Sequence, residues 1–235
     1  MLISNLIFTL ADSTGTESPY EAFHFNVSHS GDYCVLAAEQ STTKLGVDLM
    51  KVEVSGGMGR LAGFFRSMTR QFSEAEWRYI RSAEGGDESK LARFIRLWSL
   101  KEALVKAEGS GIILPLSRLS FACPTKLVAP GQAIVTDSSV TVVNPGEGHR
   151  PLPEPWAFEE CMLDRLHYVS VAKQVKQEGK DDGDHHQNNN NNHHLGFEML
   201  AIEDLLAEAQ NLSLSPGQLC THDDEKYWTD FCRKS

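Results

Sequence analysis

Charged side chains interrupt two segments where the sequence otherwise predicts buried structure. The first is Asp48, at the end of the strand-like run Leu-Gly-Val-Asp at 45–48, and the second is Glu102, inside the helical run 98–106. A carboxylate among apolar groups costs free energy unless a cation compensates its charge. Two carboxylates with a nearby lysine, here Lys106, suit a complex of Mg²⁺ with a pyrophosphate. We therefore expect Asp48 and Glu102 to bind a metal.

Helical periodicity decides which face of the long helix carries Glu102. Apolar residues recur at spacings of three and four along residues 91–105, and Glu102 falls on the same stripe, so we expect it to face the core. Lys106 follows one turn later, whereas Lys101 is offset to the side. The alternative is a surface pair of Glu102 with Lys106, worth only about 0.3–0.5 kcal/mol.

For Asp48 and for the segment 26–29, a purely structural role is the alternative to a functional one. An aspartate at a strand end commonly bonds to nearby backbone. The segment 26–29 (Asn-Val-Ser-His) ends a strand before a Ser-Gly-Asp turn, where His29 could hydrogen-bond a phosphate, although a lone histidine is more often structural. The functional interpretation therefore depends on the residues acting together.

Strands, then helices, then strands again are expected along the first 175 residues, which indicates an α+β fold. Two strands joined by a turn at 30–32 are predicted within 23–38, and a third over 44–50 carries Asp48. Helices are predicted over 60–71, over 73–83 with a capping box of Ser73 and Glu76, and over 89–107, ended by Gly109. Later strands are predicted at 118–123, 132–143, 156–161 and 166–175.

Charge and cysteine usage exclude several classes of protein. The chain has 235 residues and a net charge of −10, of which residues 178–235 hold most, so we expect no nucleic acid partner. Residues 60–106 carry an excess of basic over acidic side chains, which favours docking of an anionic partner there. The apolar residues 1–10 are too short to span a bilayer, so no membrane association is expected. The five cysteines are scattered, as in a cytosolic protein without disulfides.

Beyond residue 176 the composition becomes polar. Residues 177–195 are rich in Asp, His and Asn and are predicted to be a disordered linker rather than a transition-metal site formed by the histidines. Residues 196–235 are an acidic tail with a predicted short helix.

Four ordered motifs resemble the Sfp-type 4′-phosphopantetheinyl transferases, in particular their animal cytosolic members. These motifs are Phe-Asn-Val-Ser-His-Ser-Gly-Asp-Tyr at 25–33, Leu-Gly-Val-Asp at 45–48, Phe-Ser-Glu-Ala-Glu-Trp at 72–77 and Trp-Ser-Leu-Lys-Glu-Ala-Leu-Val-Lys at 98–106. The resemblance covers about residues 19–175. It implies a pseudo-twofold α+β fold with coenzyme A between two halves. It also implies transfer of phosphopantetheine from coenzyme A to a carrier-protein serine, releasing adenosine 3′,5′-bisphosphate.

The resemblance also implies a role for each site residue. Asp48 and Glu102 would bind Mg²⁺ on the pyrophosphate, and Glu102 would help to deprotonate the serine hydroxyl. Lys106 would hold a phosphate and stabilise developing charge, with Lys101 as a weaker candidate. Coenzyme A would further be contacted by Asn26, Val27, Ser28 and His29. The expected partners are coenzyme A and acyl carrier domains, of the fatty acid synthase and aminoadipate-semialdehyde dehydrogenase types.

Two departures from the family pattern qualify this expectation. Met50 stands where many bacterial members have a second acid, which would leave the metal one more water ligand. Residues 1–43 are expected to be only a remnant of the N-terminal subdomain, before a catalytic C-terminal subdomain at 44–176. The alternatives are a truncated, non-catalytic module that binds carrier proteins and, less favoured, a Mg²⁺-dependent phosphohydrolase.

Overall fold

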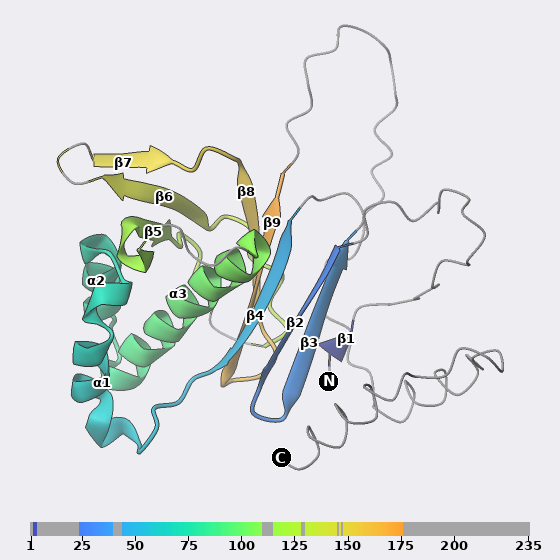
Figure 1. The fold of residues 1–235 in the computed structure, drawn as a ribbon. Coiled ribbons are helices and arrows are strands. Elements are labelled where there is room, and N and C mark those ends of the chain that lie inside the picture. The colour runs from blue at the N-terminus through green and yellow to red at the C-terminus, as the bar shows by residue number, and fades with distance from the viewer. Residues whose placement is uncertain are drawn as a thin grey trace, which may run out of the picture. The chain divides into compact units, whose positions relative to one another are not determined.

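Short strands and three helices make up the part of the chain that the structure, a computed structural model, describes (Figure 1). That part comprises residues 24–39, 44–109, 115–127, 130–144, 146 and 148–175, together with the backbone of 2–3, all within one compact unit, Met1–Met199. The strands are β1 Leu2–Ile3, β2 His24–Ser30, β3 Tyr33–Glu39, β4 Leu45–Lys51, β5 Leu119–Ala122, β6 Ser139–Asn144, β7 Gly148–Pro151, β8 Trp156–Met162 and β9 His167–Gln174. The α-helices are α1 Leu61–Ser67, α2 Glu74–Arg81 and α3 Gly86–Glu108.

The strands form three small sheets, with orders β1-β3-β2, β4-β9-β8 and β5-β6-β7. All pairs are antiparallel except β1 with β3. Helices packed on antiparallel sheets confirm the predicted α+β class. The predicted tail helix, the linker 177–195 and the tail 196–235 lie outside the described residues, and the division at residue 43 stays a prediction.

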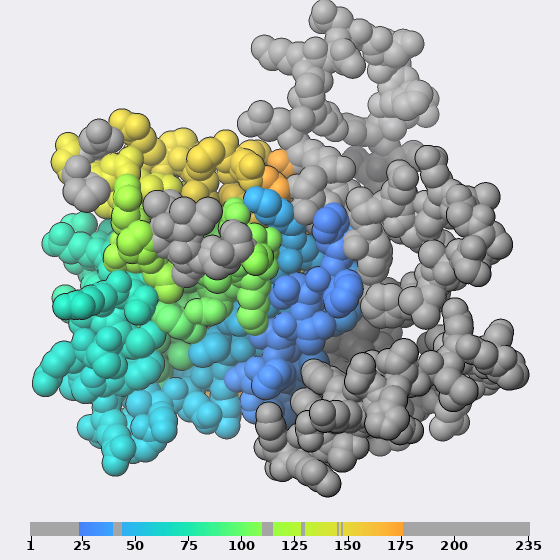
Figure 2. Space-filling model, in the orientation of Figure 1, coloured from blue at the N-terminus to red at the C-terminus, as the bar shows by residue number. Residues whose placement is uncertain are grey.

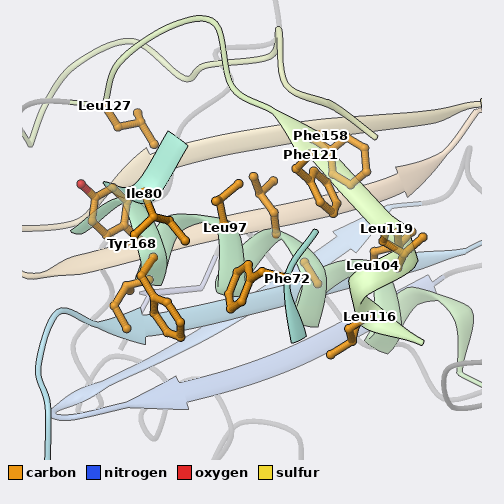
Figure 3. Packing of buried hydrophobic residues seen from close by; sticks show 14 of the residues in the cluster. Phe72, Ile80, Leu97, Leu104, Leu116, Leu119, Phe121, Leu127, Phe158 and Tyr168 are labelled. Atoms are coloured by element: carbon orange, nitrogen blue, oxygen red, sulfur yellow. The ribbon is translucent and has the colours of Figure 1, made fainter. Parts of the chain in front are cut away.

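The central sheet, β4-β9-β8, buries both of its faces. On one face it packs against α3, within an apolar cluster that also takes in the labelled side chains of Figure 3, such as Leu104, Phe158 and Tyr168. On the other face Val47 of β4 and Val169 of β9 pack against Val35 of β3. Since successive side chains of a strand alternate between faces, Gly46 and Asp48 are left on the α3 side.

Capping signals in the sequence account for the start of α2 and the end of α3. Ser73 and Glu76 form the predicted capping box of α2, each bonding to the other's backbone N–H. The longest helix, α3, begins at Gly86, three residues before the predicted start, and ends at Gly109, whose φ of 65° is left-handed as in common C-caps. The predicted helix over 60–71 is shorter, because 3₁₀ turns at 58–60 and 69–71 flank α1.

Two predictions for the later strands are wrong. Of the segment 132–143, only β6 from Ser139 onward is a strand, although Val135 forms an isolated bridge with Glu160. The strand β7 was not predicted, because its residues Gly-His-Arg-Pro are exposed throughout and show no apolar alternation. In the part of the chain that the structure describes, no helix is long and apolar enough to cross a membrane.

One close contact sets the distance between β4 and α3. A Cβ atom placed on Gly46 would lie 2.1 Å from the carbonyl oxygen of Ala103 and 2.4 Å from the backbone nitrogen of Ala107. Real Cβ atoms do not approach backbone so closely, so only glycine lets the helix lie this near the strand. The next inward-facing position of β4 is Asp48, which therefore lies under the last turns of α3.

Candidate functional site

Asp48 is a buried carboxylate between β4 and α3. It is only 4% exposed, and its Oδ1 atom accepts hydrogen bonds from Lys106 Nζ at 2.8 Å and from Ser28 Oγ at 3.2 Å. Burial raises the pKa of Asp48, and the bonds from Lys106 and Ser28 oppose that shift. Ser99 of α3 also donates to the backbone carbonyl of Asp48, at 3.2 Å. Asp48 lies in the middle of β4 rather than near its end as predicted, and β4, α3 and β2 converge on its carboxylate.

Lys106 reaches from the last turn of α3 across the edge of β4. Besides Asp48, its ammonium bonds to Ser28 Oγ at 2.8 Å and to the carbonyl of Val47 at 3.2 Å. The side chain is 31% exposed, so Lys106 is partly accessible from solvent. The alternative considered from the sequence was a surface pair of Lys106 with Glu102, and the structure pairs Lys106 with Asp48.

Glu102 lies one turn before Lys106 and is half-buried. Desolvation raises the pKa of Glu102, the negative charge of Asp48 raises it further, and Lys106 opposes the shift. Two carboxylates that repel each other across a partly buried site are an arrangement that a divalent cation relieves. The predicted neighbours Asp48, Glu102 and Lys106 are therefore brought together by the fold.

The residues present fit a hard divalent cation. Asp48 Oδ2 is buried without a hydrogen-bond partner in the described structure, which leaves an anionic oxygen unsatisfied. Oxygen ligands from one or two carboxylates, completed by water and substrate phosphates, are typical of Mg²⁺ sites. Among the described residues no group of three or more His, Cys, Asp or Glu side chains is placed to hold a metal. Asp48 and Glu102 are therefore the two protein ligands that we assign to the cation.

The segment 26–29 divides between two faces of β2. Asn26 and Ser28 point towards β4, where Asn26 Oδ1 accepts from the Val47 N–H at 3.1 Å and Ser28 reaches Asp48. Val27 and His29 are exposed on the opposite face, with Val27 at 44% exposure. Because side chains alternate along a strand, these two pairs cannot use their side chains on the same group of a ligand.

Lys101 requires a correction. The structure buries its side chain completely, and its ammonium pairs with Glu76 at 2.9 Å and donates to the carbonyls of Leu116 and Leu119 at 2.8 and 2.5 Å. An ammonium with these partners lies inside the fold, so the prediction that Lys101 contacts coenzyme A is wrong. Glu102, expected in the core, instead lies at its edge.

The partner of Lys101 could not be read from helical periodicity. Glu76 comes from α2, where its carboxylate also accepts from the backbone nitrogens of Ser73 and Phe121. That carboxylate lets a lysine occupy a core position of α3.

Sequence reasoning also missed two serines beside Asp48. Ser99, one turn before the Lys-Glu pair, bonds to the Asp48 carbonyl as described, and Ser170 is the residue of β9 directly opposite Asp48. The Ser170 hydroxyl is buried and, in the described structure, has no hydrogen-bond partner. In the sequence each is a single serine within a helical or strand-like run, which by itself does not indicate a site.

Comparisons with known proteins agree on one family. The family model described as the 4′-phosphopantetheinyl transferase superfamily matches residues 44–133, which include Asp48, Glu102 and Lys106. Similar over most of the chain is the L-aminoadipate-semialdehyde dehydrogenase-phosphopantetheinyl transferase of Xenopus laevis, 36% identical over 94% of this chain and 66% of that protein. The Homo sapiens protein of the same name is 34% identical over 92% of this chain and 64% of its own length.

Two further matches are more limited. A phosphopantetheinyl transferase of Thraustochytrium is 44% identical over 64% of this chain and 48% of that protein. Among solved structures, holo-[acyl-carrier-protein] synthase of Thermotoga maritima aligns with a TM-score of 0.38 and 17% identity, over 59% of this chain and 67% of that one. The chain spans 64% to 66% of the length of the two animal proteins.

Proposed function

The chain belongs to the 4′-phosphopantetheinyl transferase superfamily, and from this premise we propose that it transfers 4′-phosphopantetheine from coenzyme A to a serine of a carrier protein. In this reaction the serine Oγ forms a bond to the phosphorus that bears the pantetheine. The bond from that phosphorus to the bridging pyrophosphate oxygen breaks, and the oxygen leaves with adenosine 3′,5′-bisphosphate. The serine proton passes to a base.

The observation that supports this proposal is the convergence of Asp48, Glu102 and Lys106 between β4 and α3. Asp48 and Glu102 are the residues that would hold Mg²⁺, which when bound neutralises charge on the pyrophosphate. We assign Glu102 as the base for the serine hydroxyl, directly or through water, since its half-buried carboxylate lies beside Asp48 and Lys106. Lys106 has a partly exposed ammonium that would bind a phosphate oxygen and stabilise developing charge.

Coenzyme A binding beside this site is assigned to β2. We propose that His29, which is exposed on the face of β2 that points away from β4, contacts a phosphate of coenzyme A. Val27, on the same face, would pack beside the ligand. Asn26 and Ser28 face β4 instead, where their side chains bond to Val47 and Asp48, so any effect of these two on coenzyme A would pass through those neighbours. Phosphoryl transfer depends mostly on positioning and charge neutralisation, which these residues supply.

The carrier protein would dock on the arginine-rich surface of α1 and α2. Of the basic residues at 60–106, Arg96 and Lys101 are buried in ion pairs, whereas Arg60, Arg66, Arg70, Arg78 and Arg81 are exposed. Acidic carrier domains are attracted by such a surface. We propose carriers of the aminoadipate-semialdehyde dehydrogenase type, named in the relatives, and of the fatty acid synthase type. A cytosolic setting is supported by the free cysteines Cys34, Cys123 and Cys161.

Incubating the chain with Mg²⁺, coenzyme A and an apo acyl carrier protein tests the proposal. Intact-mass measurement should show one added phosphopantetheine per carrier and an equal amount of adenosine 3′,5′-bisphosphate. Glu102→Gln should abolish the addition, whereas Glu108→Gln, on the same helix but paired with Lys44, should keep it. Salt-sensitive binding of the carrier without any added mass would instead show a non-catalytic binding module and overturn the proposal.

A further inference from the structure

The segment between Asn26 and Ser30 contacts β4 in a regular pattern that its proposed role in coenzyme A binding does not explain. In the central sheet β4 pairs on one side with β9, and its other side is an edge that faces β2. The backbone N–H groups of Val47, Leu49 and Lys51 point towards that edge. Unpaired edge groups ordinarily remain open to water or to another strand.

Each of these N–H groups is met by a side chain of β2. Val47 donates to Asn26 Oδ1 at 3.1 Å, Leu49 to Ser28 Oγ at 3.2 Å and Lys51 to Ser30 Oγ at 3.2 Å. In every pair the partners are separated by 21 residues, so the two strands run side by side in a parallel sense, with a constant register. We call these three bonds the side-chain ladder; in Figure 2 the blue atoms of the β2–β3 hairpin lie beside the lighter blue atoms of the segment that includes β4.

Ser28, the middle residue of the side-chain ladder, makes more hydrogen bonds than Asn26 or Ser30 does within this site. A serine hydroxyl has one proton to donate and two lone pairs to accept with. Ser28 donates to Asp48 Oδ1 at 3.2 Å and accepts from Leu49 N at 3.2 Å and from Lys106 Nζ at 2.8 Å. All three capacities are in use, and Ser28 is only 6% exposed, so its hydroxyl has none left for a ligand.

The ladder therefore fixes the relative positions of the two charged groups that it touches. Ser28 bonds to Asp48 and Lys106 at once, and the Val47 carbonyl, next to the first rung, also accepts from Lys106. Movement of β2 along β4 would break all three rungs together, because they share one register. The side chains of Asp48 and Lys106 are thereby held in fixed positions relative to β2 and β4.

We propose that Asn26, Ser28 and Ser30 are positioning residues that hold Asp48 and Lys106 in their reactive arrangement, with Ser28 as the central one. This inference rests on the proposed function for its kinetic consequence, but the ladder itself is a structural claim that can be tested without activity. It separates the two rows of β2: the inner row positions the catalytic groups, and the outer row, with His29, remains open to the ligand.

Amide hydrogen exchange measured by NMR on the full chain tests the ladder first. Ser28→Ala should speed exchange of the Leu49 amide about tenfold, the factor that a typical net hydrogen bond represents, with smaller changes at Val47 and Lys51. Ser120→Ala is the matched control, since Ser120 is also 6% exposed and loses one buried bond, to Ser73. Equal exchange of the Leu49 amide in Ser28→Ala and Ser120→Ala would overturn the ladder.

Kinetics and metal titration test the positioning role. Ser28→Ala should lower kcat and the affinity for Mg²⁺ about 10- to 100-fold, as loss of a partner behind a metal ligand typically does, and at saturating Mg²⁺ it should leave KM for coenzyme A nearly unchanged. Ser28→Thr keeps the hydroxyl and should restore kcat, and Ser120→Ala should leave it unchanged. A raised KM for coenzyme A with normal kcat would overturn the inference in favour of direct contact. If the wild-type chain transfers nothing, the proposed function fails, and exchange and Mg²⁺ affinity alone decide about Ser28.

Discussion

Asp48 and Lys106 illustrate how much a single residue's role depends on partners far away in the sequence. Their ion pair, at 2.8 Å, joins a strand to a helix, and Ser28 of a third element completes it. The sequence indicated that an acid–acid–lysine set should converge, because carboxylates are costly in apolar segments. It could not indicate that Lys106 would contact Asp48 rather than Glu102, since that choice depends on the distance between β4 and α3.

Lys101 shows the opposite outcome at the same scale. Periodicity placed Glu102 in the core and Lys101 at the side, and the structure reverses them. The reason is that α3 is covered on several sides, by β4, β9, α2 and β5, so its buried surface is wider than one apolar stripe. A charged residue on such a helix is buried or exposed according to whether another element brings a counter-charge.

Glu102 should cost stability in the absence of metal. Its pKa is raised in the folded chain above its ordinary value of 4.5, so folded protein binds the proton more tightly than unfolded protein. The resulting penalty is absent at pH values below 4.5 and grows as the pH rises towards the folded pKa. Glu102→Gln should therefore raise the thermal midpoint of the metal-free chain at pH 7 but not at about pH 4.

Differential scanning calorimetry with and without Mg²⁺ checks this prediction. Mg²⁺ should stabilise the wild-type chain more than Glu102→Gln, because a ligand stabilises the state that binds it. Glu108→Gln serves as control and should not gain stability, since it loses an ion pair with Lys44. A lower midpoint for metal-free Glu102→Gln at pH 7 would contradict the assigned repulsion with Asp48.

Lys101→Met should destabilise the fold without touching the site. Removing the ammonium leaves the Glu76 carboxylate buried without its counter-charge, which typically costs about 3–5 kcal/mol. Urea unfolding should show this loss, and the double variant with Glu76→Gln should recover part of it. The affinity of the folded protein for coenzyme A should not change. If Lys101→Met bound coenzyme A more weakly while its stability was unchanged, the prediction that Lys101 contacts coenzyme A would be correct after all.

Among the elements, the contact of α3 with β4 is the one that assembles the site. Most elements were predictable, because capping, glycine stops and apolar alternation are local signals. The exposed strand β7 and the irregular start of segment 132–143 were not predictable. The four residues of β7 are all exposed and show no alternation of apolar and polar side chains. In the segment 132–143, the apolar residues before β6 form only one isolated bridge, between Val135 and Glu160. The side-chain ladder between β2 and β4 was equally invisible, since its bonds span 21 residues.

Gly46→Ala should separate α3 from β4. A methyl group would lie 2.1 Å from the Ala103 carbonyl oxygen, so the helix must shift, at a typical overpacking cost of about 1–3 kcal/mol. Lys106 should then lose its bond to Asp48, which lowers transfer activity of the folded fraction as well as stability. Denaturant unfolding and single-turnover transfer measure the two effects.

Gly63→Ala provides the comparison for that variant. Gly63 lies within α1, a methyl group added there would meet no other atom within 4 Å, and alanine favours helix by about 0.5–1 kcal/mol. It should be neutral or stabilising and fully active. If Gly46→Ala behaved like Gly63→Ala, the close approach of α3 to β4 would not be what positions the site.

For the whole molecule, the central sheet lies between α3 on one face and the β2–β3 hairpin on the other, so that three elements meet at Asp48. The α+β class and the family were expected from the motifs and are confirmed, whereas the placement of the central sheet between α3 and the hairpin was not predicted. The chain spans 64% to 66% of the length of its animal relatives, and its action on coenzyme A can be tested directly.

Calorimetric titration of the purified full chain with coenzyme A, with and without Mg²⁺, is that test. If Asp48, Glu102 and Lys106 form one metal and pyrophosphate site, coenzyme A should bind with one site per chain and more tightly with Mg²⁺. The Mg²⁺ enhancement should disappear in Asp48→Ala, because one remaining carboxylate holds the cation weakly. Binding that is equally tight with and without Mg²⁺, or unchanged in Asp48→Ala, would contradict the site.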